Sequence, residues 1–462
     1  MRYCFPSYIC LCVSIEVHLN LYAQHRHIMD RHFSVYKDDD AMIDVIRRCT
    51  KETSLYKSSK DAFYVMDLGY LVRTVDEWKQ LLPGVHPCYA VKANRDPALI
   101  NLMSKMNFGF DCASKGEIQQ MLELGVNPSR IVYSHPRKQP SHLRYASSVG
   151  VDLTVFDDED ELHKIKEIAP NMKLLLRLST RGLGNLRKDV LPENFGCLKK
   201  DSAKLLAMAK KLNLKVTGVS FHVGLAIETP DIYSRALKHA KLVFSEARDL
   251  GFEMKVLDLG GGFPAATTTN FCSLGFDKVA GTIAKSLKEE FGDENNVLVF
   301  AEPGTHFSMP SAALVVNIIG KRTRNQEDSE PTESPEKDEP EIEYFINDGK
   351  FQSFVVYLAL PYVKPVVKPV DQKYTDSPLK SCRVWGQTCA RDDLVLENGE
   401  LPEMSAGEWL YFTDMGAYSA VVGSNFNGFQ LPTVHHYMSE SMKERLDELV
   451  SGGAFGEINF CV

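Results

Sequence analysis

Short apolar, β-branched runs alternate with amphipathic helical patterns through the middle of the chain, and this alternation constrains the fold most strongly. Helices are predicted over segments such as "GEIQQMLELGV" and "DEDELHKIKEIA". Strands are predicted near residues 87–92, 108–111, 130–133, 152–156, 173–178, 216–222, 254–259 and 297–302. Eight strand–helix units over roughly 220 residues indicate the α/β class and, within it, a (β/α)8 barrel.

A polar residue follows most of these runs, at the carboxyl ends of the strands, where barrel enzymes place their chemistry. One such residue alone would more often cap a strand, but a whole set favours a site assembled from several loops. The set comprises Lys92, Asp111, His135, Arg177, His222, the glycines 260–262 and Glu302.

Beyond Glu302 the helical patterns give way to short β-like runs such as "AALVVNIIG" and "EWLYFTDMGAY", which predict an all-β C-terminal domain. A segment rich in charge, proline and serine, residues 322–343, is expected to be a disordered loop inside it. The expected organisation is an extension that is disordered or alternatively started (1–28), a segment joining the β domain (29–61), the barrel (62–308), the all-β domain (309–450) and a short tail (451–462).

Composition and charge limit which binding partners and which cellular compartment we expect for this protein. The net charge of −8 and the lack of a basic arm argue against nucleic acid. The 11 cysteines are scattered without zinc spacing, so we expect reduced thiols, a cytoplasmic protein and no metal site. The apolar start of the chain is interrupted by Glu16, His18 and Asn20, which disfavours a signal peptide or a membrane span.

Four motifs, "CYAVKAN", "SFHVG", "LDLGGGFP" and "AEPG", suit an aldehyde cofactor that carries a phosphate. Lys92, shielded from water, is expected to have a depressed pKa and to form a Schiff base. Residues 260–262 would expose backbone N–H groups to the phosphate, while Glu302 holds a pyridine nitrogen protonated and His222 lies against the ring. Taken one at a time, the glycines could form a flexible loop, His222 could be a core histidine and Lys92 could be a salt-bridged lysine. Together, in barrel order, they predict a site for pyridoxal 5′-phosphate (PLP).

The motifs, together with "FGFDCASKGEIQ", "NDG", "LPEM", "MGAY" and "FNGFQ", resemble the eukaryotic ornithine decarboxylases and their relatives, which include the antizyme inhibitors. The resemblance extends from about Lys60 to Ser439. It implies an alanine-racemase-like barrel with an all-β domain, PLP as cofactor, and a homodimer with active sites shared between subunits. Antizyme is an implied possible partner beside the amino-acid substrate.

The resemblance also implies roles for individual residues. It implies catalytic roles for Lys92, for His222 and for Cys389, which would be given across the subunit interface to protonate the product. Phe426 resembles an aromatic wall of the substrate pocket. Contacts with the cofactor are implied for Lys92, Asp111, Arg177, His222, Gly260, Gly261, Gly262, Glu302 and Tyr418.

Two departures from the family concern the cofactor phosphate. Leu225 and Ala226 follow "HVG" where the family usually has Ser-Gly, and Thr305 follows "EPG" where the family has an arginine that grips the phosphate. A neutral hydroxyl in place of a bidentate cation is expected to weaken phosphate binding by about 1–3 kcal/mol.

A third departure concerns the substrate. The family meets the distal ammonium of ornithine with two aspartates, whereas this chain offers Ala359 and Leu360 at one position and Ala390 at the other. An unpaired buried ammonium costs several kcal/mol, while a buried isobutyl group gains roughly 1.5–3 kcal/mol. We therefore expect PLP-dependent decarboxylation of an apolar L-amino acid, leucine to isopentylamine, and the sequence is similar to a leucine decarboxylase of the family. Asp392 and Asp393 lie nearby and leave the pocket open to a rearrangement.

Two alternatives remain at this point. One is ornithine decarboxylation to putrescine, the polyamine precursor, in a rearranged pocket. The other is a non-catalytic protein of the antizyme-inhibitor kind, which the altered phosphate residues favour. Retention of Lys92, Glu302 and Cys389 favours an enzyme, because a binding protein needs none of them.

Overall fold

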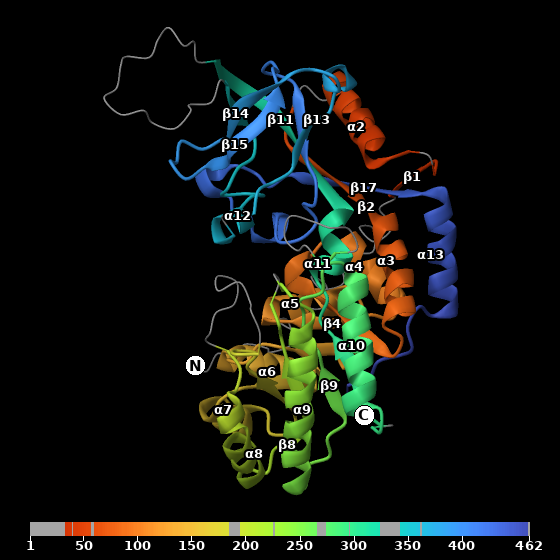
Figure 1. The fold of residues 1–462 in the computed structure, drawn as a ribbon, viewed down its shortest axis with the longest axis vertical. Helices are drawn as coiled ribbons and strands as arrows, with labels where there is room; N and C mark the ends of the chain where they lie inside the picture. The colour runs from red at the N-terminus through yellow and green to blue at the C-terminus, as the bar shows by residue number, and fades with distance from the viewer. Residues whose placement is uncertain are drawn as a thin grey trace, which may run out of the picture.

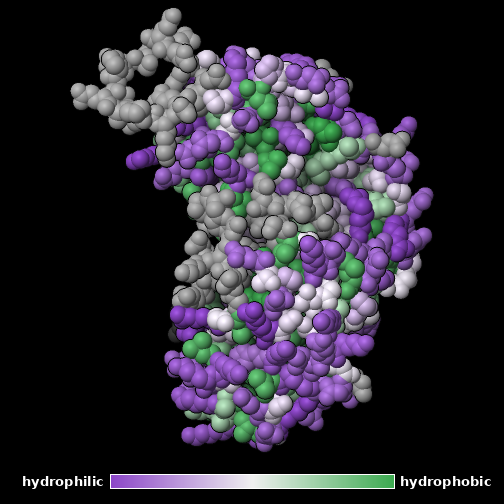
Figure 2. Space-filling view, viewed as in Figure 1, coloured by the Kyte–Doolittle hydropathy of each residue, from purple (hydrophilic) through white to green (hydrophobic). Residues whose placement is uncertain are grey.

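The computed structural model describes residues 33–38, 40–56, 60–183, 195–224, 227–265, 274–294, 296–323, 342–360 and 363–460. Figure 1 shows two units stacked along the long axis, a barrel wrapped in helices and a sheet domain above it. The predicted extension 1–28 and residues 225 and 226 lie outside the described residues. On the face shown in Figure 2, hydrophilic residues dominate, as expected for a chain with a quarter of its residues charged.

The barrel is closed by eight parallel strands, which confirms the predicted (β/α)8 fold. Its strands follow the order β10-β3-β4-β5-β6-β7-β8-β9 around the barrel. They are β3 (Val85–Ala90), β4 (Gly109–Cys112), β5 (Ile131–Tyr133), β6 (Leu153–Phe156), β7 (Lys173–Leu178), β8 (Lys215–Phe221), β9 (Val256–Asp258) and β10 (Leu298–Ala301).

Amphipathic helices cover the outside of the barrel, each with its apolar stripe against the strands. Short polar side chains start several of them: Ser114 accepts a hydrogen bond from Glu117 N, and Asp158 from Glu161 N. The helices are α3 (Leu68–Leu81), α4 (Pro97–Lys105), α5 (Lys115–Glu123), α6 (Pro140–Ser148), α7 (Glu159–Ile168), α8 (Ser202–Lys211), α9 (Asp231–Asp249) and α10 (Phe276–Phe291).

The second unit is a mixed nine-stranded sheet of order β1-β17-β2-β11-β12-β14-β15, with β16 pairing β11 and β13. Its strands are β1 (Ser34–Tyr36), β2 (Phe63–Asp67), β11 (Ala312–Thr323), β12 (Ile342–Ile346), β13 (Val367–Pro369), β14 (Leu379–Trp385), β15 (Leu394–Pro402), β16 (Trp409–Phe412) and β17 (Thr433–Ser439). β2 pairs in this sheet although it falls within the range expected for the barrel. β11 and β12 pair through Thr323 and Ile342, so both ends of the predicted loop 322–343 are strand, and 324–341 lie outside the described residues.

Helices also belong to this unit, so the expected all-β domain is not purely β. They are α2 (Met42–Tyr56), α12 (Val356–Ala359) and α13 (Glu440–Gly452), while α11 (Thr305–Ser308) follows β10. α13 runs beside α3 of the barrel (Figure 1) and joins the two units. No described helix is both long and apolar enough to cross a membrane.

The end of the chain closes the amino-terminal end of the barrel. Ile458 and Phe460 are buried in a cluster with Cys88 and Phe300, and the rings of Phe300 and Phe460 lie 5.1 Å apart. Phe460 N donates to Ser129 O at 2.8 Å. Because this end is filled, the carboxyl ends of the strands are left to form a site.

Candidate active site

Lys92 lies two residues beyond the end of β3, in a single 3-10 turn (Val91–Ala93). β3 and β4 are neighbours with Ala90 opposite Asp111, which brings Lys92 Nζ into an ion pair with Asp111 Oδ2. Asp111 is 1% exposed, whereas the Lys92 side chain is 41% exposed. The amine is therefore held by a buried carboxylate yet can be reached by a small molecule.

The pKa of Lys92 shifts in the direction opposite to the one expected from the sequence. Burial by itself lowers the pKa of Lys92, but the carboxylates of Asp111 and Glu302 outweigh burial and raise the pKa overall. The predicted depression of the Lys92 pKa is therefore wrong. The neighbouring strand supplies Asp111 as the partner, so the alternative of a salt-bridged lysine describes this residue in the structure.

Glu302 follows β10 and is 4% exposed. Its backbone N–H donates to Gly260 O at 2.7 Å, and one carboxylate oxygen, Oε1, accepts a hydrogen bond from the Ser134 hydroxyl. Burial raises the pKa of Glu302, and Asp111 adds to this, while Lys92 and Ser134 oppose the rise. The second oxygen, Oε2, has no hydrogen-bond partner among the described residues and could accept one from a ligand.

The sequence reasoning missed Ser134, the residue next to the candidate His135. Ser134 follows β5 directly and reaches Glu302 across the barrel end. His135 instead turns back on its own loop, where its Nδ1 accepts a hydrogen bond from Arg137 N at 3.1 Å. The only signal for Ser134 was its place immediately after an apolar run.

His222 follows β8, and its Nδ1 accepts a hydrogen bond from Gly261 N at 2.9 Å. Burial, with Arg177 and Lys92 nearby, lowers the pKa of His222 well below its ordinary value. The imidazole is therefore neutral at physiological pH, with Nδ1 as the acceptor and the proton on Nε2.

The glycine loop offers fewer N–H groups than expected. Gly260 N donates to Asp258 Oδ1 at 2.8 Å and Gly261 N donates to His222, so Gly262 N is the one of the three without an acceptor among the described residues. A Cβ on Gly260 would lie 1.9 Å from Phe221 O, and one on Gly262 2.5 Å from Gly224 O, with φ values of +62° and +103°. Close packing of the backbone therefore requires glycine at these positions whether or not a phosphate binds there.

Asp258 is a second residue that the sequence reasoning missed. It ends β9 with no exposed surface, and its Oδ2 has no partner among the described residues. Burial and the nearby Glu302 raise the pKa of Asp258 well above its usual range. An acid inside the apolar run "VLDLGGG" was the available signal.

Tyr418 joins the sheet domain to this site. It adopts φ +52°, and its N–H donates to Ala93 O at 2.8 Å, next to Lys92. Burial raises the pKa of Tyr418, and the charge of Lys92 opposes the rise. Arg177, half-buried on β7, acts electrostatically on His222 and Glu302. The nine cofactor candidates thus come together at one end of the barrel.

The remaining candidates lie on the sheet domain. Cys389 is exposed and Ala390 half-buried in the loop after β14, while Leu360 is 8% exposed at the end of α12. Phe426 is 44% exposed and its ring lies 4.8 Å from that of Phe351. None of these four contacts Lys92 within the described part of one chain.

Asp393 does not enter a pocket. It has no exposed surface, and its carboxylate accepts hydrogen bonds from Lys350 N at 2.7 Å, Thr388 N at 2.9 Å and Thr388 Oγ1 at 2.6 Å. Asp392 beside it is exposed. The rearrangement left open for Asp393 would have to break all three bonds.

These groups fit PLP on grounds of geometry and chemistry. An accessible amine, a carboxylate with a free oxygen and a neutral imidazole surround one end of the barrel, and the glycines form a cradle that any Cβ would fill. PLP needs an amine for its aldehyde, an acid for its ring nitrogen and backbone donors for its phosphate. In the part of the chain that the structure describes, no three His, Cys, Asp or Glu side chains are placed to hold a metal ion.

Comparison with known proteins agrees with this fit. Residues 68–309 match the family model described as pyridoxal-dependent decarboxylase, pyridoxal binding domain. The chain is 38% identical over 429 residues to ornithine decarboxylase of Rattus norvegicus, covering 92% of this chain and 90% of the relative. It is 36% identical over 430 residues to antizyme inhibitor 2 of Xenopus laevis, covering 92% and 91%.

A solved structure, the arginine decarboxylase of Paramecium bursaria Chlorella virus, superimposes with a TM-score of 0.77 at 32% identity, covering 85% of this chain and all of that one. The fold and the matched domain define a PLP-dependent amino-acid decarboxylase with an alanine-racemase-like barrel. Within that class, the chain belongs to the ornithine decarboxylase family.

Proposed function

We propose that this decarboxylase acts on an apolar L-amino acid, converting leucine to isopentylamine. The observation that carries the proposal is the loss of both recess acids: Leu360 and Ala390 stand where the resemblance places the family's aspartates. Asp393, the buried acid of the same loop, is already committed to Lys350 and Thr388. An ammonium would be left unpaired there, whereas an isobutyl group would gain roughly 1.5–3 kcal/mol.

Ornithine, decarboxylated to putrescine, is the second candidate, and the names of the relatives support it better than leucine. Ornithine decarboxylases from rat and from Schizosaccharomyces pombe are 38% and 39% identical to this chain. One feature of the structure also favours it: Asp392 is exposed beside Cys389 and makes no hydrogen bond or ion pair among the described residues. That carboxylate is free to meet a distal ammonium.

The same residues would share the work of the reaction. Bound PLP supplies an aldehyde that condenses with amines and a ring that withdraws electrons from the substrate's Cα. Glu302, fixed on one oxygen by Ser134, would keep the ring nitrogen protonated with the other. The neutral His222 would pack against the ring, and Gly262 N and Tyr418 would face the phosphate.

Protonation of the product requires an acid close to Cα. Lys92 carries an ammonium beside Asp111 and could return a proton there. We assign the same role to Cys389 of a second subunit, because Cys389 is exposed and, among the described residues of its own chain, contacts none of the site. Sharing of this kind requires a homodimer in which each active site contains residues of both subunits. We propose that this homodimer is cytoplasmic. Mixing inactive Lys92→Ala and Cys389→Ala proteins should restore CO2 release only if sites are shared.

A non-catalytic role, with antizyme as a partner, is the rival from another class, since antizyme inhibitor 2 is a relative. Retention of Lys92, Asp111 and Glu302 around one accessible space favours catalysis. A binding protein of this kind would give neither CO2 nor the visible absorption of a lysine-bound cofactor.

The experiment is a panel of all natural L-amino acids with purified protein, saturating PLP and CO2 as the readout. Leucine is expected to be the fastest substrate. Faster turnover of ornithine or lysine would overturn the leucine proposal while leaving the decarboxylase intact. Absence of CO2 from every amino acid, in protein that binds PLP through Lys92, would overturn catalysis itself.

A further inference from the structure

Two buried side chains hold the backbone immediately after the glycine loop. Thr305 Oγ1 donates to Phe263 O at 3.0 Å, and His306 Nδ1 donates to Pro264 O at 2.8 Å. Thr305 is 9% exposed and His306 is not exposed at all. Consecutive residues of α11 therefore bind consecutive carbonyls of the loop.

The hydrogen bond to Pro264 O identifies the tautomer of the neutral His306 ring. Burial lowers the pKa of His306 to about 4, so the ring is neutral at physiological pH. A carbonyl oxygen accepts and cannot donate, so the single ring proton is on Nδ1. The ring lies 4.1 Å from that of Phe276 and 5.5 Å from that of Trp78, and His306 O accepts a hydrogen bond from Tyr70. The donor is thus fixed in orientation.

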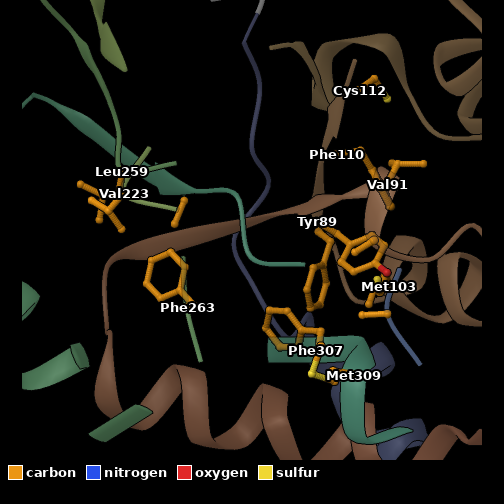
Figure 3. Close-up of a cluster of buried hydrophobic side chains, with 14 of the residues drawn as sticks. Tyr89, Val91, Met103, Phe110, Cys112, Val223, Leu259, Phe263, Phe307 and Met309 are labelled. Carbon is orange, nitrogen blue, oxygen red and sulfur yellow. The ribbon is translucent and has the colours of Figure 1, made fainter. Parts of the chain in front are cut away.

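The loop is also held through its other residues. The ring of Phe263 lies in the same buried cluster as Val223 and Phe307 (Figure 3) and is 4.9 Å from that of Trp78. Tyr233 OH donates to Gly261 O at 3.1 Å. With these contacts in place, Thr305 and His306 fix the last part of the loop that would otherwise be free to move.

We propose that Thr305 and His306 are positioning residues that hold the glycine loop in its phosphate-binding shape. The proposal rests on the proposed role of that loop as the phosphate site. Thr305 directs its hydroxyl proton to Phe263 O, so it cannot donate the same proton to a phosphate. A loop held in place before binding loses less conformational entropy on binding, which can substitute for part of a missing charge. Neither residue contacts the reacting atoms.

Thr305→Val and His306→Phe test this, because each keeps the shape of the buried side chain and removes its donor. The measurement is the equilibrium dissociation constant of the cofactor-free protein for PLP and for pyridoxal, which lacks the phosphate. Each variant is expected to bind PLP about 3–10-fold more weakly and pyridoxal as the wild type does, the size of one lost hydrogen bond. The matched control is Ser311→Ala, which removes a buried hydroxyl that donates to Ser308 O away from the loop.

Hydrogen exchange of the backbone N–H groups of residues 260–263 gives a second readout that needs no cofactor. Faster exchange there in both variants, and not in Ser311→Ala, is expected. Equal weakening of PLP and pyridoxal, or unchanged PLP affinity in both variants, would overturn the proposal. Wild-type protein that binds pyridoxal as tightly as PLP would instead overturn the role of the loop as a phosphate site. The choice of substrate is tested separately by the amino-acid panel.

Discussion

The carboxyl end of the barrel and the loops of the sheet domain differ in how firmly they hold their functional residues. At the barrel end, Asp111, Glu302 and Asp258 are almost fully buried, and each accepts a hydrogen bond. On the sheet domain, Cys389 and Phe426 are exposed within one chain. A rigid scaffold thus carries the cofactor chemistry, while two of the residues proposed to meet the substrate, Cys389 and Phe426, are exposed on loops.

The two regions also differ in how far this chain keeps the residues that the family resemblance implies. Every strand-end residue singled out for PLP is retained, whereas the positions assigned to the distal ammonium are Leu360 and Ala390. A buried network tolerates few substitutions because each member satisfies another. The apolar side chains of Leu360 and Ala390, although buried and half-buried, are not members of such a polar network. Chemistry and specificity are therefore separable by mutation, and the predictions below test that separation.

The largest expected effect is at the barrel end. Lys92→Ala should remove the visible absorption of the bound cofactor and lower CO2 release by a factor on the order of 10³ or more, since the described residues place no other amine there. Lys79→Ala, an exposed lysine on α3, is the control. A Lys92→Ala protein that still releases CO2 at the wild-type rate would contradict the assignment of the cofactor chemistry to the barrel end.

The second effect is on the sheet domain. Leu360→Asp combined with Ala390→Asp should raise the ratio of kcat/KM for ornithine to that for leucine by about 100-fold or more, because paired carboxylates stabilise a buried ammonium. Absorption of the bound cofactor should not change. Leu358→Asp, on the exposed side of α12, is the control. Loss of cofactor absorption in the double variant would contradict the separation.

The third prediction concerns the burial of His306. Its folded-state pKa of about 4 lies below the unfolded value of about 6.5, so the unfolded state binds more protons and stability falls as pH drops through this window. His306→Phe should remove about 2 kcal/mol of the stability loss seen between pH 7.5 and 5. Urea unfolding at both pH values measures it, with the exposed His163→Phe as control. Identical pH dependence in wild type and His306→Phe would count against a buried neutral imidazole.

The smallest effect is expected at Ser134. Its hydrogen bond lowers the pKa of Glu302, against the effect of burial, so Ser134→Ala should raise that pKa and move the acidic limb of the activity profile to higher pH. Loss of one such bond should reduce kcat about 3–10-fold with KM unchanged. Steady-state kinetics across pH measures both. A change confined to KM would place Ser134 on the substrate side instead.

Much of the fold and of the cofactor site could be predicted because the signals are local. The eight strands lie close to the predicted ranges, since apolar runs between helical patterns report burial residue by residue. Lys92, Asp111, His222 and Glu302 were found because each ends an apolar run. Strand ends converge in a barrel whatever the details of packing.

Side-chain pairing could not be predicted in this way. From the sequence alone we could predict that Lys92, Asp111, His222 and Glu302 meet at the barrel end, but not that Ser134 and Asp258 join them. The tertiary structure was needed to show that Asp111 holds Lys92 charged, that Asp393 accepts hydrogen bonds from Lys350 and Thr388, and that the Thr305 hydroxyl donates to Phe263 O. The physical reason is that these bonds depend on ångström-scale distances between separate segments, to which hydrophobic periodicity is insensitive.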